Sequence, residues 1–151
     1  MVGPAGDGGV MAVVRTCDLA VVGSGPGGYA AALTAARRGV RVCLIEREQW
    51  GGVCLNVGCI PTKALVTVAH LMRRLGQAHA LGIALDGYRL EYATVRARNE
   101  RIVSELRRGL TGLLRQEGVE LVSGRAAFED PHTLVITQDG VSERLEARWI
   151  V

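Results

Sequence analysis

The feature that most constrains the fold is a G-x-G-x-x-G glycine pattern directly after a short apolar run. Residues 18–22 form that run, and they predict a buried parallel strand. Residues 23–28, GSGPGG, supply the glycines, and an alanine-rich helix follows over residues 29–38. A second apolar strand, residues 40–45, comes next. Strand, glycine turn, helix and strand in this order predict a βαβ unit of a doubly wound α/β fold.

Each glycine of the pattern has a separate expected role in a dinucleotide site. Gly23 makes the tight turn, Gly25 lets the backbone approach a pyrophosphate, and Gly28 allows close helix–strand packing. Glu46 ends the second strand, where a carboxylate can accept ribose hydroxyls. A glycine turn without a ligand is the alternative, and the pattern does not separate FAD from NAD.

The rest of the chain continues an α/β pattern. We expect helices over residues 60–75 and 91–117 and a third parallel strand over 119–122. The first of these helices is expected to turn four apolar side chains to the core: Leu65, Val68, Ala69 and Leu71. A small antiparallel meander is expected from strands at residues 126–128, 133–137 and 144–147, followed by another apolar strand from residue 149.

Cys54 and Cys59 are the second feature that carries chemistry. On a regular helix, residues five apart are separated by about 7.5 Å along the axis, beyond the ~7 Å Cα separation that a disulfide tolerates. The two thiols can therefore bridge only across irregular backbone, which Asn56 and Gly58 permit. Buried inert thiols are one alternative. Half of a zinc site is another, but the sequence supplies no further ligands at the usual spacing.

The residues after the second cysteine favour redox chemistry. Pro61 suits the first turn of a helix, which leaves Cys59 near a helix N-terminus where a thiolate is favoured. Lys63 follows, and it is the only lysine in a chain whose other basic residues are all arginine. A compact ammonium is therefore expected at this point. Cys17 and Cys43 lie in or beside apolar strands and are expected to be core residues.

Composition excludes several classes of function. The net charge of +3 and the aromatic content of 4% do not favour nucleic-acid binding. Four cysteines in 151 residues are too few for a secreted disulfide scaffold, so a reducing cytoplasm is expected. No apolar run is expected to approach the ~20 residues of a membrane span, so we expect no membrane association. Residues 1–16 are expected to form a disordered leader and not a signal peptide.

Residues 51–63, GGVCLNVGCIPTK, resemble the redox-active segment of the flavoprotein disulfide reductases. Within that family the segment is most similar to the dihydrolipoamide dehydrogenase branch. It departs at Trp50, where leucine is usual, and at Thr62, where serine is usual. Leu55 and Ile60 distinguish it from glutathione and mercuric reductases, which tend to carry valine at both places.

The resemblance implies a Rossmann-like FAD-binding domain with a redox-active Cys54–Cys59 disulfide. It implies that Cys59 lies against the flavin, that Cys54 exchanges with lipoamide, and that Lys63 lies near the flavin ring. The residues expected to bind FAD are Gly23, Gly25, Pro26, Gly28, Glu46, Arg47, Gly51, Gly52, Val53, Cys54, Lys63 and Ala126. No metal is expected.

The resemblance also implies how the chain relates to a whole enzyme. It covers residues 17–151 and matches only the N-terminal part of a family member, so the NAD and interface domains are expected to be absent and the isolated chain inactive. The complete enzyme would pass electrons from dihydrolipoamide through the cysteines and FAD to NAD. It would be a homodimer within 2-oxoacid dehydrogenase complexes. The alternatives are a freestanding FAD or thiol-redox module and a fragment of mercuric or glutathione reductase.

Overall fold

The computed structural model describes residues 14–151. Most of the expected leader, residues 1–13, lies outside the described residues. Two compact units divide the described chain: residues 14–48 with 114–151, and residues 49–113. Each unit is described by itself.

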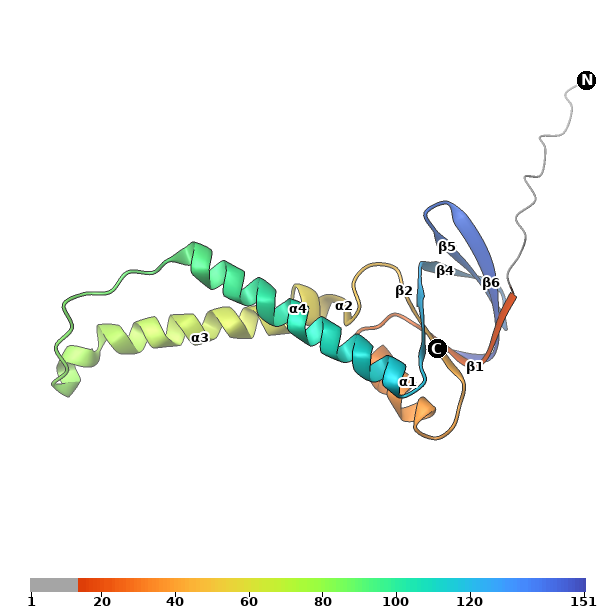
Figure 1. Cartoon of the computed structure of the whole chain (residues 1–151), viewed down its shortest axis with the longest axis horizontal. Helices are drawn as coiled ribbons and strands as arrows, with labels where there is room; N and C mark the ends of the chain where they lie inside the picture. Colours follow the sequence, from red (N-terminus) through yellow and green to blue (C-terminus); the bar gives the residue numbers. More distant parts are fainter. Residues whose placement is uncertain (1–13) are drawn as a thin grey trace, which may run out of the picture. The chain divides into compact units, whose positions relative to one another are not determined.

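The first unit contains a six-stranded mixed sheet, most of whose strands are labelled in Figure 1. Its strand order is β3-β2-β1-β6-β5-β4. Its strands are β1 (Val14–Val22), β2 (Val42–Glu46), β3 (Glu120–Ser123), β4 (Arg125–Asp130), β5 (Thr133–Gln138) and β6 (Val141–Ile150). The pairs β1–β2, β2–β3 and β1–β6 are parallel, whereas β4–β5 and β5–β6 are antiparallel. The fold is therefore the expected one, a parallel sheet joined to a small antiparallel meander.

Two strands differ from the sequence prediction. β1 begins at Val14, so residues 14–16 belong to the strand and not to the leader. β6 runs unbroken from Val141 to Ile150, so the last meander strand and the expected next strand are one element. Both differences have the same cause, because Val14 to Ala20 pair with Arg144 to Ile150 across the sheet. Pairing with a distant partner extends strands through residues that are not apolar.

The first unit buries side chains on both faces of β2, because the consecutive residues 42–45 are all buried. Its buried cluster contains Cys17, Ala20, Cys43, Ile45, Val122, Leu134, Ile136, Leu145 and Ala147. Cys17 and Cys43 are thus core residues, as expected, and Cys43 Sγ also donates to Glu120 Oε2 at 3.4 Å. α1 (Pro26–Ala36) follows the glycine turn and packs on β1 and β2.

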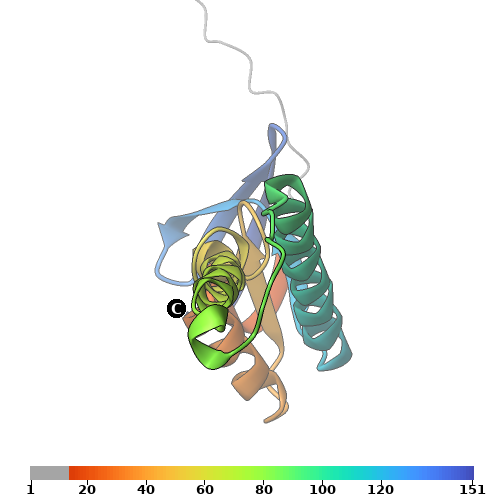
Figure 2. The same ribbon diagram turned by 90° about the vertical axis from the view of Figure 1, so that its left-hand side faces the viewer.

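Helices make up the second unit. They are α2 (Gly52–Asn56), α3 (Cys59–Gly76), the short 3₁₀ helix η1 (Ala78–Leu81) and α4 (Tyr92–Gln116), which extends past Leu113 into the first unit. Figure 2 shows α3 nearly end-on, with the chain returning after η1 to the start of α4. The helix predicted from residue 60 is therefore present as α3. The short helix α2 before it was not predicted, because its segment begins with two glycines.

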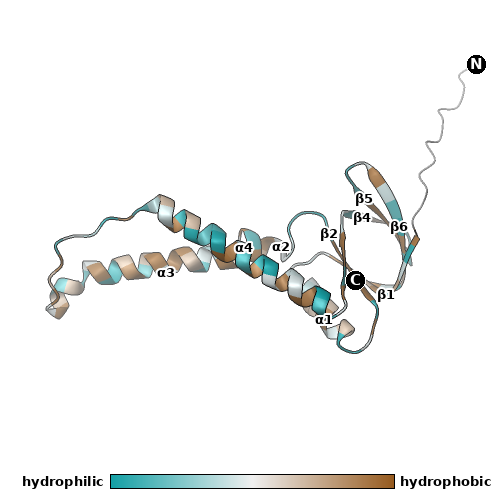
Figure 3. Cartoon of the chain, in the orientation of Figure 1, coloured by the Kyte–Doolittle hydropathy of each residue, from teal (hydrophilic) through white to brown (hydrophobic). Residues whose placement is uncertain are grey.

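α3 does not bury the face that its apolar spacing predicts. None of its residues is buried, and Leu65 and Leu71 are 38% and 57% exposed. In Figure 3 the apolar colour recurs along α3, interrupted by hydrophilic positions. Periodicity identifies an apolar face of a helix, but it does not identify what covers that face.

The segment 52–76 is long and apolar enough to cross a membrane, judged by length and composition alone. This corrects the expectation that no segment approaches such a length. It is a weak indication of a membrane span, because the segment breaks between α2 and α3 and carries Lys63, Arg73 and Arg74.

Candidate functional site

The glycine turn joins the end of β1 to the start of α1. Gly23 has φ +98°, a left-handed conformation that glycine adopts without strain. A Cβ on Gly28 would lie 1.8 Å from the Gly23 carbonyl oxygen, so only glycine allows this contact between turn and helix. At Gly23 and Gly25 an added Cβ would meet nothing within 4 Å. The turn is thus packed against its own helix at Gly28 and open at the other two glycines.

Glu46 presents a fixed carboxylate beside this turn. Its Oε2 accepts hydrogen bonds from the Ser24 backbone N–H at 3.0 Å and the Ser24 hydroxyl at 2.6 Å. Its Oε1 accepts the Glu48 backbone N–H at 3.0 Å. Burial opposes ionisation of Glu46, but the hydrogen bonds from Ser24 and the following amides outweigh it and lower the pKa of the carboxyl. The carboxylate is therefore charged and oriented.

A cavity of about 350 Å³ lies where the turn, the end of β2 and the start of β4 meet. Gly124 completes its wall, because the Gly124 N–H donates to the Glu46 carbonyl at 2.9 Å. The lining residues are Val22, Gly23, Ile45, Glu46, Arg47, Gly124, Arg125 and Ala126. Four of the predicted residues, Gly23, Glu46, Arg47 and Ala126, are therefore brought together. Sequence reasoning missed Ser24 and Gly124, although the strand-end position of Gly124 was a usable signal.

The cysteine pair lies in the second unit, on two different helices. Cys54 belongs to α2, and Cys59 is the first residue of α3. The break between them falls at Val57 and Gly58, where Gly58 has φ −114° and ψ −108°. A Cβ on Gly58 would lie 3.0 Å from the Val53 carbonyl oxygen and 3.2 Å from Cys54 Cα. Gly58 thus lets the two helices approach closely, which is the irregular backbone that the spacing predicted.

The two thiols face one another. The side-chain hydrogen bond with Cys59 is the main cause that raises the pKa of the Cys54 thiol, with burial adding to it. The Cys59 backbone amide and the Lys63 ammonium act in the opposite direction. Cys54 is half-buried and Cys59 is exposed. Lys63 follows Cys59 by one helical turn, so both side chains lie on the same face of α3.

The predicted residues of the cysteine segment include two glycines with positive φ. Gly51 and Gly52 have φ of +94° and +62° and precede Cys54. An added Cβ at Gly51 would lie 2.7 Å from Leu55 Cδ1. Val53 is exposed at the start of α2. Within residues 14–151, no group of three or more His, Cys, Asp or Glu side chains could hold a metal ion.

The predicted site residues thus fall into two groups. Gly23, Gly25, Pro26, Gly28, Glu46, Arg47 and Ala126 belong to the first unit, and Gly51, Gly52, Val53, Cys54, Cys59 and Lys63 belong to the second. Within each group the residues come together. That both groups serve one cofactor stays a prediction.

Comparison with known proteins identifies the class to which this fold and these residues belong. The family model described as pyridine nucleotide-disulphide oxidoreductase matches residues 17–151. The chain belongs to this family. Its fold is also that of a solved relative, the HOCl-induced flavoprotein disulfide reductase RclA from Escherichia coli, with a TM-score of 0.73 and 27% identity over 90% of this chain and 28% of that one.

Within the family, several curated relatives of this chain are dihydrolipoyl dehydrogenases. The enzyme from Chlamydia muridarum is 42% identical over 74% of this chain and 24% of its own length. The enzyme from Geobacillus stearothermophilus is 42% identical over 78% of this chain and 25% of its own length. A Bacillus subtilis enzyme is 37% identical over 88% of this chain and 30% of its own length. The chain thus spans about a quarter of the length of these relatives.

Proposed function

We propose that this chain supplies the FAD-binding turn and the redox-active cysteines of a dihydrolipoyl dehydrogenase, which transfers electrons between dihydrolipoamide and NAD. The observation that carries the proposal is the arrangement of Cys54, Cys59 and Lys63. The two thiols face each other across the Val57–Gly58 break, with the ammonium one turn further along α3. The relatives named dihydrolipoyl dehydrogenase support the choice within the family.

The residues of the first unit fit the adenosine half of FAD. Space lies open above Gly23 and Gly25, where a pyrophosphate would approach the start of α1. Glu46 offers a charged, oriented carboxylate to ribose hydroxyls at the edge of the cavity. When bound, FAD would supply a two-electron carrier between the thiols and a nicotinamide.

The cysteines would exchange with a dithiol substrate in two displacements. One substrate thiolate attacks Sγ of Cys54 in the Cys54–Cys59 disulfide, which breaks that bond and leaves Cys59 as the thiolate. The second substrate thiolate then attacks the substrate sulfur bonded to Cys54. This step closes the substrate disulfide and releases Cys54, which takes up a proton. The raised pKa of the Cys54 thiol favours that protonated product.

The remaining features of a whole enzyme belong to the same proposal. They are NAD as the electron acceptor, a homodimer, a place in 2-oxoacid dehydrogenase complexes and a cytoplasmic location. We expect the 151-residue chain by itself to exchange with dihydrolipoamide but not to reduce NAD, because the family resemblance assigns the nicotinamide site to a later domain. A freestanding FAD or thiol-redox module is the alternative.

Titration of the purified chain with FAD tests the cofactor part of the proposal. We expect FAD fluorescence to be quenched on binding. Glu46→Gln should weaken binding about tenfold, because a hydrogen bond to a charged group contributes roughly 1.5–3 kcal/mol. The neighbouring Glu48→Gln is the matched control, and its affinity for FAD should stay within about twofold of the wild-type affinity. Equal affinities for the two variants would contradict the role of Glu46.

Peptide-level mass analysis tests the thiol part. The oxidised chain should lose its Cys54–Cys59 disulfide on treatment with dihydrolipoamide. With lipoamide, the oxidised substrate, Cys59→Ser should give a mixed disulfide, because the Cys54 thiolate opens the substrate disulfide and no Cys59 thiol displaces the substrate; alkylation of the freed substrate thiol preserves this species. Cys54→Ser should give no mixed disulfide at this position. A disulfide that never forms between these two residues would refute the redox assignment.

A further inference from the structure

The Asn56 side chain folds the backbone that leads into the cysteine pair. Its Nδ2 lies 3.3 Å from the Gln49 carbonyl oxygen, 3.0 Å from that of Trp50 and 2.8 Å from that of Gly52. The two N–H groups of the Asn56 amide thus donate to three backbone carbonyls, all of which precede Cys54. Asn56 itself remains helical at the end of α2, so its contribution comes from the side chain and not from an unusual backbone conformation.

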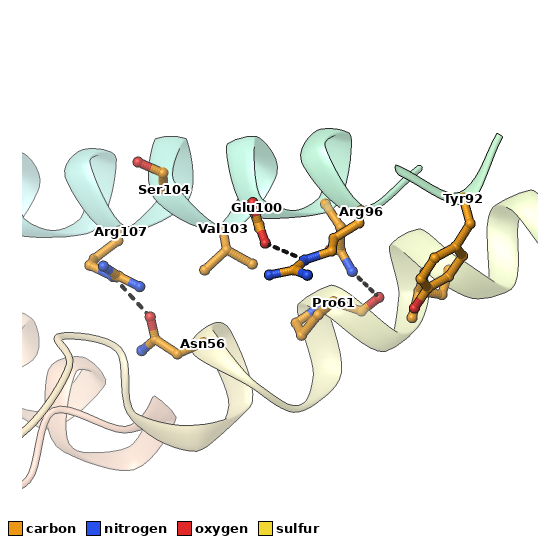
Figure 4. Close-up of a pocket in the computed structure, with 10 residues that line it drawn as sticks. Asn56, Pro61, Tyr92, Arg96, Glu100, Val103, Ser104 and Arg107 are labelled. Carbon is orange, nitrogen blue, oxygen red and sulfur yellow. Dashed lines mark hydrogen bonds and ion pairs between the residues drawn. The ribbon is translucent and has the colours of Figure 1, made fainter. Parts of the chain in front are cut away.

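The other end of the same amide is held by α4. Arg107 Nε donates to Asn56 Oδ1 at 2.9 Å, and both side chains are half-buried (Figure 4). A carboxamide has an acceptor end and a donor end, so a cation at Oδ1 directs Nδ2 toward the three carbonyls. Because the acceptor meets a charged donor, this hydrogen bond is of the stronger kind.

A second polar contact from α4 reaches the start of α3. Asn99 Nδ2 donates to the Pro61 carbonyl oxygen at 3.3 Å. Asn56 ends the helix that carries Cys54, and Pro61 lies in the first turn of the helix that carries Cys59. α4 therefore contacts residues on both sides of the break between the two cysteines, a side chain before it and a backbone carbonyl after it.

We propose that Arg107 is a positioning residue for the Cys54–Cys59 pair, acting through Asn56 to hold the two sulfurs in the arrangement from which they form a disulfide. This inference rests on the proposed redox function. Oxidation by glutathione disulfide joins the two sulfurs, releases two glutathione molecules and conserves all electrons and protons. A turn that is already held loses less conformational freedom when the bond closes, so the equilibrium favours the disulfide.

Loss of the Arg107 contact should therefore make the Cys54–Cys59 disulfide less stable. Without the contact from Arg107, the reduced turn gains freedom that it must give up on closing the bond. The Cys54–Cys59 disulfide then becomes easier to reduce. We expect Arg107→Met to lower the equilibrium constant for disulfide formation about tenfold, which corresponds to ~30 mV for a two-electron couple.

The test measures this constant for the 151-residue chain in glutathione buffers of graded ratio. Quenched samples are alkylated, and the peptides that carry Cys54 and Cys59 are quantified by mass spectrometry. Arg108→Met is the matched control, because Arg108 is the exposed neighbour on the same helix. The equilibrium constant of Arg108→Met should stay within about twofold of the wild-type value. Arg107→Lys keeps the charge without the Nε donor and should lower the constant by about threefold, part of the full effect.

The outcomes separate the two claims. If the wild type forms no Cys54–Cys59 disulfide at any ratio, the redox function fails and this inference fails with it. If the wild type forms it and both Arg107 variants match Arg108→Met, the redox function stands and the positioning role is overturned. Circular dichroism identifies an unfolded variant, and if Arg107→Met does not fold, Arg107→Lys against Arg108→Met decides alone.

Discussion

Substitution of Gly28 by alanine is a sharp test of the glycine turn. The added methyl carbon would lie 1.8 Å from the Gly23 carbonyl oxygen, whereas real Cβ atoms essentially never approach within 3.0 Å. The oxygen belongs to the backbone and cannot rotate away, so the turn or α1 must shift. Forcing an extra methyl group into a packed site costs about 1–3 kcal/mol, and a backbone obstacle places this site at the upper end.

A gain in helix propensity opposes that cost. Alanine stabilises a helix interior by about 1 kcal/mol relative to glycine, so the net loss for Gly28→Ala is about 2 kcal/mol. Gly27→Ala is the matched control, since it lies in the same helix and its added Cβ meets nothing within 4 Å. That variant should gain up to about 1 kcal/mol, which leaves roughly 3 kcal/mol between the two variants.

Urea unfolding followed by circular dichroism measures both variants against the wild type. Gly28→Ala should lower the midpoint and Gly27→Ala should raise or preserve it. Gly28→Ala with the same unfolding free energy as Gly27→Ala would refute the reasoning, because the close approach of turn and helix would then be absent from the molecule in solution.

Two further predictions concern charge and thiol accessibility. The pKa of Glu46 is lowered in the folded chain, so its ionised form stabilises the fold fully above its unfolded pKa of about 4.3, and this contribution is lost as the pH falls through the folded value. Melting temperatures between pH 6 and 3 should therefore fall less steeply for Glu46→Gln than for the wild type, and parallel curves would contradict the assignment. Iodoacetamide should label Cys59 and Cys54 in the native reduced chain but spare Cys17 and Cys43, which are 7% and 1% exposed. All four should react in urea, and native labelling of Cys43 as fast as Cys59 would show that the core is not closed.

The parts of the fold that depend on local pattern were predictable from the sequence. The glycine turn, the strand before it and the helix after it follow from neighbouring residues, and the structure confirms them. The same holds for the third strand, the meander and the turn at Asp139 and Gly140, which have φ of +51° and +81°. Local conformational preference and apolar spacing are sufficient for such elements.

What the sequence did not predict depends on partners far along the chain. The length of β1 comes from pairing with β6. The strand includes Arg15, whose guanidinium forms ion pairs with Glu120 and Glu143. The side-chain role of Asn56 depends on Arg107, which is remote in sequence. In the site, the types and spacing of Cys54, Cys59 and Lys63 indicated the chemistry, but no spacing rule indicates which side chain of α4 orients the turn.

The central place of β6 has a consequence for the order in which the chain can fold. β1 pairs with β6 through residues about 130 positions apart, and Val22 N–H donates to the Val151 carbonyl at 2.7 Å. The strand before the glycine turn is thus completed on one side only after residues about 130 positions later have been synthesised. During synthesis, the edge of β1 beside the glycine turn stays unpaired until β6 is made, so chaperone binding is expected to be strongest just before β6 emerges.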